Sequence, residues 1–197
     1  MPPVDNHDVY AHVRVLIGVV LALGLTHILS GIGRMFQYPE RWKLWPVHLL
    51  WVAIVLLSAI HFWWWEFGLI RIGPWRFELF LFVLLYAFLF YLLANLLFPA
   101  DMGDFKGFED YFMARRRWFF GLFALTLPMD LVDTLVKGRA YFESLGVEYP
   151  VRLGITLILC AIAARTASRR FHLVFAALYL VYLLSWILRL YRLELPL

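Results

Sequence analysis

Long apolar segments separated by short polar ones run through the whole chain. The six longest lie at about residues 13–34, 44–66, 77–99, 117–137, 150–168 and 171–191. Charged side chains in the first three lie at or near the segment ends, whereas Asp130, Asp133 and Arg165 lie within two of the others. A helix that crosses the hydrocarbon core of a membrane needs about 20 mostly apolar residues. The pattern therefore predicts an all-α integral membrane protein with six transmembrane helices.

The composition excludes several other classes of protein. Of 197 residues, 63% are hydrophobic and 16% are charged, against roughly 45–50% and 25% in an average soluble domain. A soluble domain of this length cannot bury so much apolar surface in one core. The single cysteine, Cys160, excludes an internal disulfide. A soluble domain, a disordered chain, a coiled coil and a disulfide scaffold are all excluded, which leaves a membrane protein.

The two halves of the chain place polar residues in a similar order. The spacing of His27, Ser30 and Arg34 in the first segment recurs in the fourth segment from Asp130 onward. Because each half holds three segments, the second half would enter the membrane from the opposite side. The order predicts a 3+3 inverted-topology repeat, which is typical of many secondary transporters. The alternative is chance, since polar residues on one helix face recur every three or four positions in any case.

The repeat divides the chain into three parts. Residues 1–100 form the first three-helix repeat and residues 116–197 form the second. Residues 101–115 connect them with an alternation of Asp, Phe and Gly. This pattern indicates an amphipathic segment that lies in the membrane interface.

One set of polar residues is predicted in the membrane half nearer the N-terminus. Ionisable groups inside the hydrocarbon are costly and face the bundle interior or a cavity. The directions of the segments place His61, Asp130 and Asp133 in this half, where a carboxylate beside the imidazole would make a proton-sensitive site. In the alternative interpretation, Asp133 pairs with Lys137 one turn away, and His61 lies in the interface beside tryptophans.

A second set is predicted in the opposite half. It comprises His27, Ser30 and Arg34 from the first segment, with Arg165 brought to the same level by the repeat. The set carries net positive charge, which would suit an anion or a substrate carboxylate. In the alternative interpretation, Arg165 extends to the interface from the end of its segment.

Basic residues indicate how the chain lies in the membrane. They are slightly more numerous on the side opposite the N-terminus, where Arg115, Arg116 and Arg117 form a cluster. By the positive-inside rule this side is cytoplasmic and the N-terminus lies outside, in a bacterial-type inner membrane or a plasma membrane. The cluster and the net charge of +4 favour anionic lipids as partners. Nothing in the pattern indicates a nucleic-acid partner.

Three functions are compatible with this pattern. The first is a small, homo-oligomeric transporter or channel that moves an ion or small solute, with proton coupling as an option, through a polar path between the repeats. The second is a non-enzymatic scaffold or assembly subunit of a larger complex. The third is a redox subunit that binds haem or quinone, for which His27 and His48 are the least unfavourable haem ligands.

Motifs for catalysis are not found in the chain. It has no phosphate-binding glycine loop, nucleophile elbow or zinc-protease motif. The sequence therefore does not favour an enzyme, and no metal is expected. A cofactor, haem or quinone, is expected only for the redox alternative.

Overall fold

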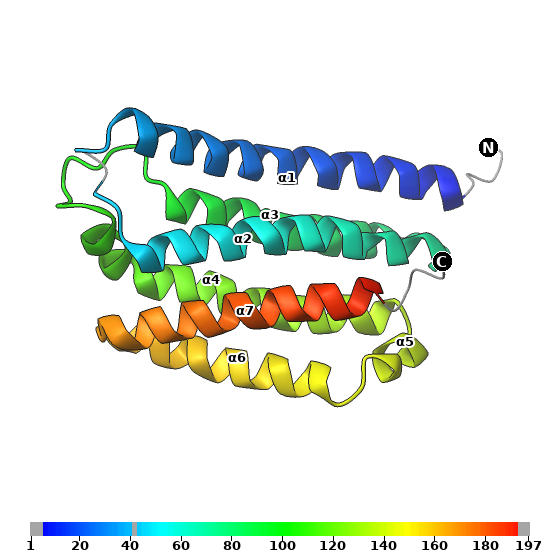
Figure 1. Ribbon diagram of the computed structural model, residues 1–197. Coiled ribbons are helices and arrows are strands. Elements are labelled where there is room, and N and C mark those ends of the chain that lie inside the picture. Colours follow the sequence, from blue (N-terminus) through cyan, green and yellow to red (C-terminus); the bar gives the residue numbers. More distant parts are fainter. Residues whose placement is uncertain (1–5, 41–42, 193–197) are drawn as a thin grey trace.

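The computed structural model describes residues 6–40 and 43–192, in which every regular element is a helix. The elements are α1 (Asn6–Gln37), α2 (Pro46–Trp65), the 3-10 helix η1 (Glu66–Arg71), α3 (Phe77–Leu97), α4 (Phe108–Val136), α5 (Arg139–Ser144), α6 (Glu148–Arg165) and α7 (Arg169–Arg192). The long helices form one bundle, with α1 and α6 at opposite edges (Figure 1). We call the end at which α1 begins the N-terminal end of the bundle, and the other the far end.

Five helices within residues 6–40 and 43–192 are long and apolar enough to cross a membrane. They lie at Asp8–Gln37, Pro46–Ile70, Phe77–Leu97, Phe108–Val136 and Arg169–Tyr191. The sixth predicted segment forms α6, whose 18 residues include Glu148, Arg152 and Arg165. Three charged residues within 18 leave α6 without a long stretch that is low in charge, so it is not among the five candidate spans and the predicted count of six is not confirmed. The all-helical membrane class is supported.

The helices pack in close pairs that do not follow the predicted repeat. α1 lies along α3, α2 along α7 and α4 along α6, while α3 also contacts α4. A dyad that exchanged the two halves would place α4 along α7, because these helices are the counterparts of α1 and α3. The observed partner of α4 is α6 instead, so the 3+3 inverted repeat is not confirmed.

The matched polar positions also make different contacts. The ring of His27 donates from Nε2 to the backbone carbonyl of Phe98 at 2.9 Å. Its counterpart Asp130 binds the side chain of Arg152 at 3.1 Å. Residues three or four apart share a helix face in any helix, so the common spacing arises without a common fold.

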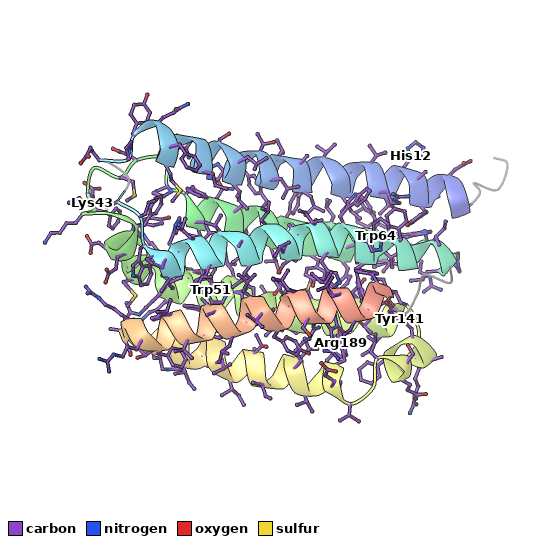
Figure 2. All side chains as sticks on the ribbon, in the orientation of Figure 1. His12, Lys43, Trp51, Trp64, Tyr141 and Arg189 are labelled. Carbon is purple, nitrogen blue, oxygen red and sulfur yellow. The ribbon has the colours of Figure 1, made fainter. Side chains whose placement is uncertain are left out.

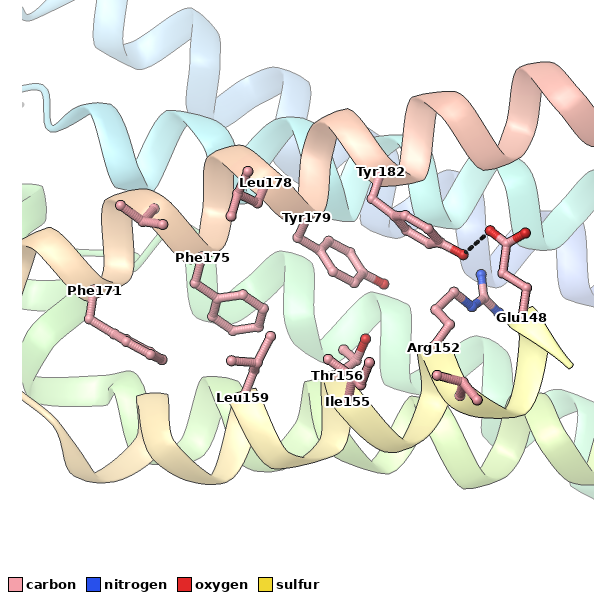
Figure 3. Close-up of a pocket in the computed structure, with 12 residues that line it drawn as sticks. Glu148, Arg152, Ile155, Thr156, Leu159, Phe171, Phe175, Leu178, Tyr179 and Tyr182 are labelled. Atoms are coloured by element: carbon pink, nitrogen blue, oxygen red, sulfur yellow. Dashed lines mark hydrogen bonds between the residues drawn. The ribbon is translucent and has the colours of Figure 1, made fainter.

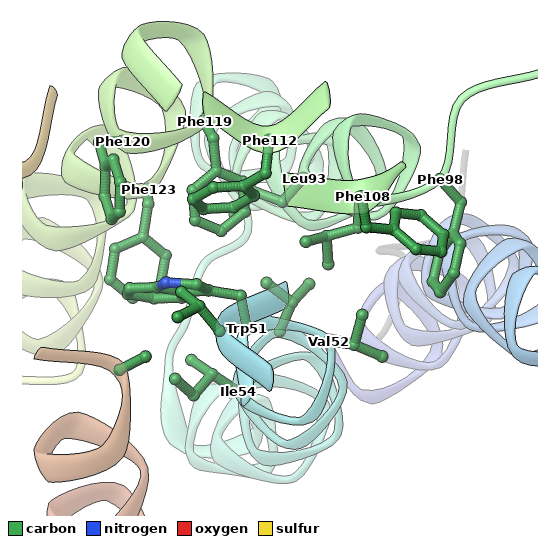
Figure 4. Close-up of a cluster of buried hydrophobic side chains, with 14 of the residues drawn as sticks. Trp51, Val52, Ile54, Leu93, Phe98, Phe108, Phe112, Phe119, Phe120 and Phe123 are labelled. Atoms are coloured by element: carbon green, nitrogen blue, oxygen red, sulfur yellow. The ribbon is translucent and has the colours of Figure 1, made fainter. Parts of the chain in front are cut away.

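Aromatic side chains fill the core between α2, α4 and α7. Trp51 of α2 is completely buried, and its ring centroid lies 5.1–5.4 Å from those of Phe119, Phe120, Phe123 and Phe175. All four rings meet the indole nearly edge-on, the arrangement that aromatic quadrupoles favour. Figure 4 shows the rings from α4 gathered over Trp51. We call these five residues the aromatic cluster.

Apolar side chains also cover the outside of the bundle. Val15 of α1, Ile158 of α6 and Leu178 of α7 are 62–67% exposed. Around the middle of the bundle most outward side chains consist of carbon alone, whereas Lys43 projects from the far end (Figure 2). Water disfavours an apolar surface of this extent, whereas lipid chains accept it. The apolar spans and this surface together indicate an integral membrane protein.

Helix α4 extends further toward the N-terminus than the sequence pattern predicted. It begins at Phe108 rather than near residue 117. Phe108 and Phe112 are buried against the core, so this part of the predicted interfacial connector belongs to the bundle. Arg115, Arg116 and Arg117 therefore lie within α4 rather than before it. Arg116 is half-buried, and the other two are exposed.

Candidate functional site

An ion pair between α4 and α6 lies in the half of the bundle nearer its N-terminal end. Asp130 Oδ2 accepts hydrogen bonds from Arg152 Nη2 at 3.1 Å and from the Tyr149 hydroxyl at 3.0 Å. Thr134 Oγ1 lies 2.9 Å from the same hydroxyl. Asp130 and Thr134 are one turn apart on α4, and Tyr149 and Arg152 are one turn apart on α6, so each pair shares a helix face. The two faces meet where these helices pack together.

Aromatic rings hold the arginine of this pair in place. The guanidinium carbon of Arg152 lies 4.7 Å from the ring centroid of Trp186 on α7 and 5.1 Å from that of Tyr149. Such cation–π contacts stabilise a cation that has lost part of its water. Arg152 thus joins α6 to both α4 and α7.

A small polar cavity lies beside the Asp130–Arg152 pair. Its volume is about 60 Å³, and its walls come from α2, α3, α4, α6 and α7. Polar side chains form much of the wall: Ser58, His61, Tyr86, Thr126, Asp130, Arg152, Thr156 and Tyr179. A buried cavity of this size with several polar partners can hold water. The site therefore combines an ion pair with room for a small polar occupant.

A second charged cluster lies between the end of α2 and the end of α4. Lys137 Nζ donates to Glu66 Oε1 at 3.0 Å and to Asp133 Oδ2 at 2.5 Å. All three side chains are at most 3% exposed, and Nζ lies 5.3 Å from the ring centroid of Trp65. We call Glu66, Asp133 and Lys137 the buried triad. Fully ionised, it holds two negative charges and one positive charge.

The triad leaves two polar atoms without partners. Glu66 Oε2 and Asp133 Oδ1 are buried and accept no hydrogen bond from any residue that the structure describes. A buried acceptor without a donor is costly. The arrangement therefore suits a state in which one of the two carboxyl groups carries a proton.

The structure brings three of the predicted site residues to this half of the bundle but pairs them differently. His61 and Asp130 both line the cavity, and they therefore lie at a similar depth along the bundle, as the sequence predicted. Over the described ranges, however, the aspartates bind Arg152 and Lys137 instead of His61. The predicted imidazole–carboxylate pair is thus not formed, and His61 packs against the rings of Trp65 and Tyr191 at 5.5 and 5.8 Å between centroids. The alternative interpretation of Asp133, a pair with Lys137, is confirmed.

The second predicted set is not brought together. Ser30 is exposed on α1, and Arg34 is half-buried near the end of the same helix. Arg165 is exposed near the end of α6, where Nη1 donates to the carbonyl of Ala161 at 3.1 Å. Because α1 and α6 lie at opposite edges of the bundle, these side chains form no common site.

Two histidines near the far end of the bundle satisfy backbone groups. His27 donates from Nε2 to the carbonyl of Phe98, and His48 donates from Nε2 to the carbonyl of Leu97 at 2.8 Å. The last carbonyls of a helix have no partner within it, so both rings cap the end of α3. Each histidine thus has a structural contact in place of the free Nε2 expected of a haem ligand.

Sequence reasoning missed Glu66, Tyr149 and Arg152 as members of the site. Arg152 lies near the beginning of its apolar segment, where a basic residue is ordinary. Its predicted depth is nevertheless the same as that of Asp130, which needed a cationic partner. This match of depth and charge is the signal that could have found the pair. No comparable signal marks Glu66, because it follows three tryptophans at a segment end, where acidic residues are ordinary.

Comparison with known proteins assigns no relative to the chain. No family model, curated protein or solved structure matches it.

Proposed function

We propose that this protein is a small proton-linked membrane carrier whose solute site is the cavity at the Asp130–Arg152 pair. The observation that carries the proposal is an ion pair that lines a polar cavity inside a largely apolar bundle. Ionisable residues kept at such depth in a membrane commonly mark ion or substrate pathways and proton relays. The pair offers both a proton acceptor and an anion-binding group.

Protonation of Asp130 would couple a proton to the solute. With Asp130 ionised, Nη2 of Arg152 is already bound to it at 3.1 Å and is not available to a second anion. A proton on Asp130 removes that competition, and a small anion takes its place on the guanidinium, a group suited to oxyanions. One proton and one anion then occupy the site together, and their net charge is zero. The loaded site is therefore no more charged than the empty one.

The size of the cavity limits the solute. A volume of about 60 Å³ accommodates an anion of a few heavy atoms. Inorganic anions and the smallest carboxylates are the matching class.

The aromatic cluster favours a carrier over an open channel. Phe123 lies in the cavity wall and also packs on Trp51. Tyr179, another wall residue, stacks on Trp51 with 6.2 Å between ring centroids. A solute leaving toward the far end would have to displace these rings. Alternating closure at such a layer is how carriers expose one site to each side in turn.

Vesicles loaded with a pH-sensitive dye test the proposal. Purified protein is reconstituted, and an inward gradient of chloride, nitrate or phosphate is applied in separate experiments. We expect at least one of these anions to acidify the lumen. Asp130→Asn should slow this acidification at least tenfold, because the amide cannot carry the proton. Anion binding by the variant should become independent of pH, because Arg152 is then always available.

Glu143→Gln is the matched control, since Glu143 forms an exposed pair with Arg139 on α5 and lies outside the cavity. It should acidify the lumen at the wild-type rate. Wild-type protein that moves a proton with none of the three anions would contradict the proposal. So would Asp130→Asn protein that is folded by size-exclusion chromatography and fully active.

A further inference from the structure

A cleft of about 350 Å³ lies between α6 and α7. This volume is within the range of small-molecule binding sites. Its wall is mostly apolar, with Leu159, Phe171, Phe175 and Leu178 along its length. Figure 3 shows these side chains between the two helices. The cleft is thus a long apolar slot with room for a chain-like occupant.

The packing of the helices explains why the cleft exists. α6 packs closely on α4 and α7 packs closely on α2, whereas α6 and α7 contact each other only slightly. Ile155 and Leu178, which line the cleft, are also 54% and 66% exposed on the outside of the bundle. In a membrane that outer face meets lipid chains. The cleft therefore opens sideways to the lipid.

The charged residues of the cleft gather at one end. Glu148, Arg152 and Tyr182 lie at the N-terminal end of the bundle, and Phe171 lies toward the far end (Figure 3). The Tyr182 hydroxyl donates to Glu148 Oε1 at 2.8 Å, and Arg189 also binds this carboxylate. Glu148 is thereby neutralised by a residue other than Arg152.

Arg152 keeps an unused donor at this end. Its Nε is buried and has no hydrogen-bond partner among the residues that the structure describes, although Nη2 binds Asp130. A buried guanidinium N–H without an acceptor is costly. An anionic group at the polar end of the cleft would supply the acceptor.

We infer that the cleft binds a single-chain amphiphile with an anionic head, the head at Arg152 and the chain running along Phe175 and Leu159 toward Phe171. The orientation agrees with that of a lipid in a membrane, whose head lies at the boundary and whose chain extends inward. The unused N–H of Arg152 selects for negative charge, and the apolar slot selects for an alkyl chain. This site goes beyond the proposed transport, because binding is measurable without any flux.

Photocrosslinking tests the inference. The wild-type protein in detergent is incubated with a long-chain fatty acid that carries a diazirine near its methyl end. After irradiation, we expect the label on peptides of α6 and α7 around Leu159, Phe171 and Phe175. Oleate should compete at least tenfold more strongly than oleylamine, which has the same chain and a cationic head. Adding lysophosphatidylglycerol, which has a single chain, as a further competitor shows whether a phosphate head is accepted as well as a carboxylate.

Two tryptophan variants on α7 provide a matched pair. Leu178 and Val181 are each 66% exposed, but only Leu178 lines the cleft. Leu178→Trp should fill the slot and reduce labelling at least fivefold, and Val181→Trp should label like the wild type. Equal labelling of the two variants would overturn the inference. Equal competition by oleylamine, or label spread over α1 as strongly as over α6 and α7, would also overturn it.

Discussion

At the scale of single residues, the buried triad is the least exposed set of ion-paired side chains in the described chain. Lys137 alone neutralises Glu66 and Asp133, at 3.0 and 2.5 Å. Removing one partner of a buried pair leaves an uncompensated charge, at a cost of about 3–5 kcal/mol. Since the triad holds two carboxylates, the effect of a substitution depends on which charge is removed. Because Lys137 is the single cation of the triad, it is the critical member.

Lys137→Met should therefore lower the free energy of unfolding by about 3–5 kcal/mol, because the ionised carboxylate of the triad loses its buried cation. Glu66→Gln should have little effect or increase stability, since it leaves one carboxylate for one ammonium. Denaturant unfolding in detergent, followed by circular dichroism, measures both changes. Arg139→Met is the control, because Arg139 forms an exposed pair and such pairs contribute at most about 1 kcal/mol. Equal stability of the Lys137 and Arg139 variants would contradict this account.

At the scale of elements, glycines set how closely α1 and α3 approach. A Cβ at Gly24 would lie 3.3 Å from the Cα of Tyr91, and a Cβ at Gly31 would overlap the buried ring of Phe98. Membrane helices associate through small residues that let their backbones come close. His27, one turn before Gly31, bonds to the carbonyl of Phe98. This face of α1 is therefore fitted to the end of α3.

Gly31→Ala should lower stability by about 1–3 kcal/mol, the usual cost of overpacking, because the Phe98 ring must move. Gly33→Ala is the matched control on the same helix, since nothing lies within 4 Å of a Cβ there. It should be neutral or slightly stabilising, because alanine favours helix more than glycine does. Thermal unfolding of the two variants in the same detergent decides the point. Comparable loss in both would show that helix propensity, not the contact with Phe98, explains the change.

At the scale of the whole molecule, the question is whether α6 crosses the membrane with the other long helices. It is shorter than the other long helices and carries three charged residues, yet it lies along α4, with Ile158 and other apolar side chains facing outward. Ser144 on α5 is exposed at the N-terminal end of the bundle, and Ala167 after α6 is exposed at the far end. If α6 crosses, these positions lie on opposite sides of the membrane.

Single cysteines at the two positions test this arrangement. Cys160 is buried, so the wild-type protein should not react with a membrane-impermeant maleimide. The positive-inside rule predicts that the N-terminal end of the bundle lies outside. In intact cells Ser144→Cys should therefore be labelled, while Ala167→Cys should be labelled only after permeabilisation. The reverse result would keep α6 as a span and place the N-terminus inside. Labelling of both from one side would show that α6 does not cross.

Local sequence determined the helices and their apolar faces. Apolar length and spacing are properties of neighbouring residues, and the predicted segments at 44–66 and 77–99 correspond closely to α2 and α3. The depth of a residue along its helix is similarly local, so His61 and Asp130 were correctly expected at one level. The pair of Asp133 with Lys137, one turn apart, is local as well. Only the tertiary structure decided which helices are neighbours and hence which cation meets Asp130 and Glu66. Helices of equal length and apolar character can be arranged in many orders, and the choice of Arg152 for Asp130 and Lys137 for Glu66 depends on contacts between distant segments.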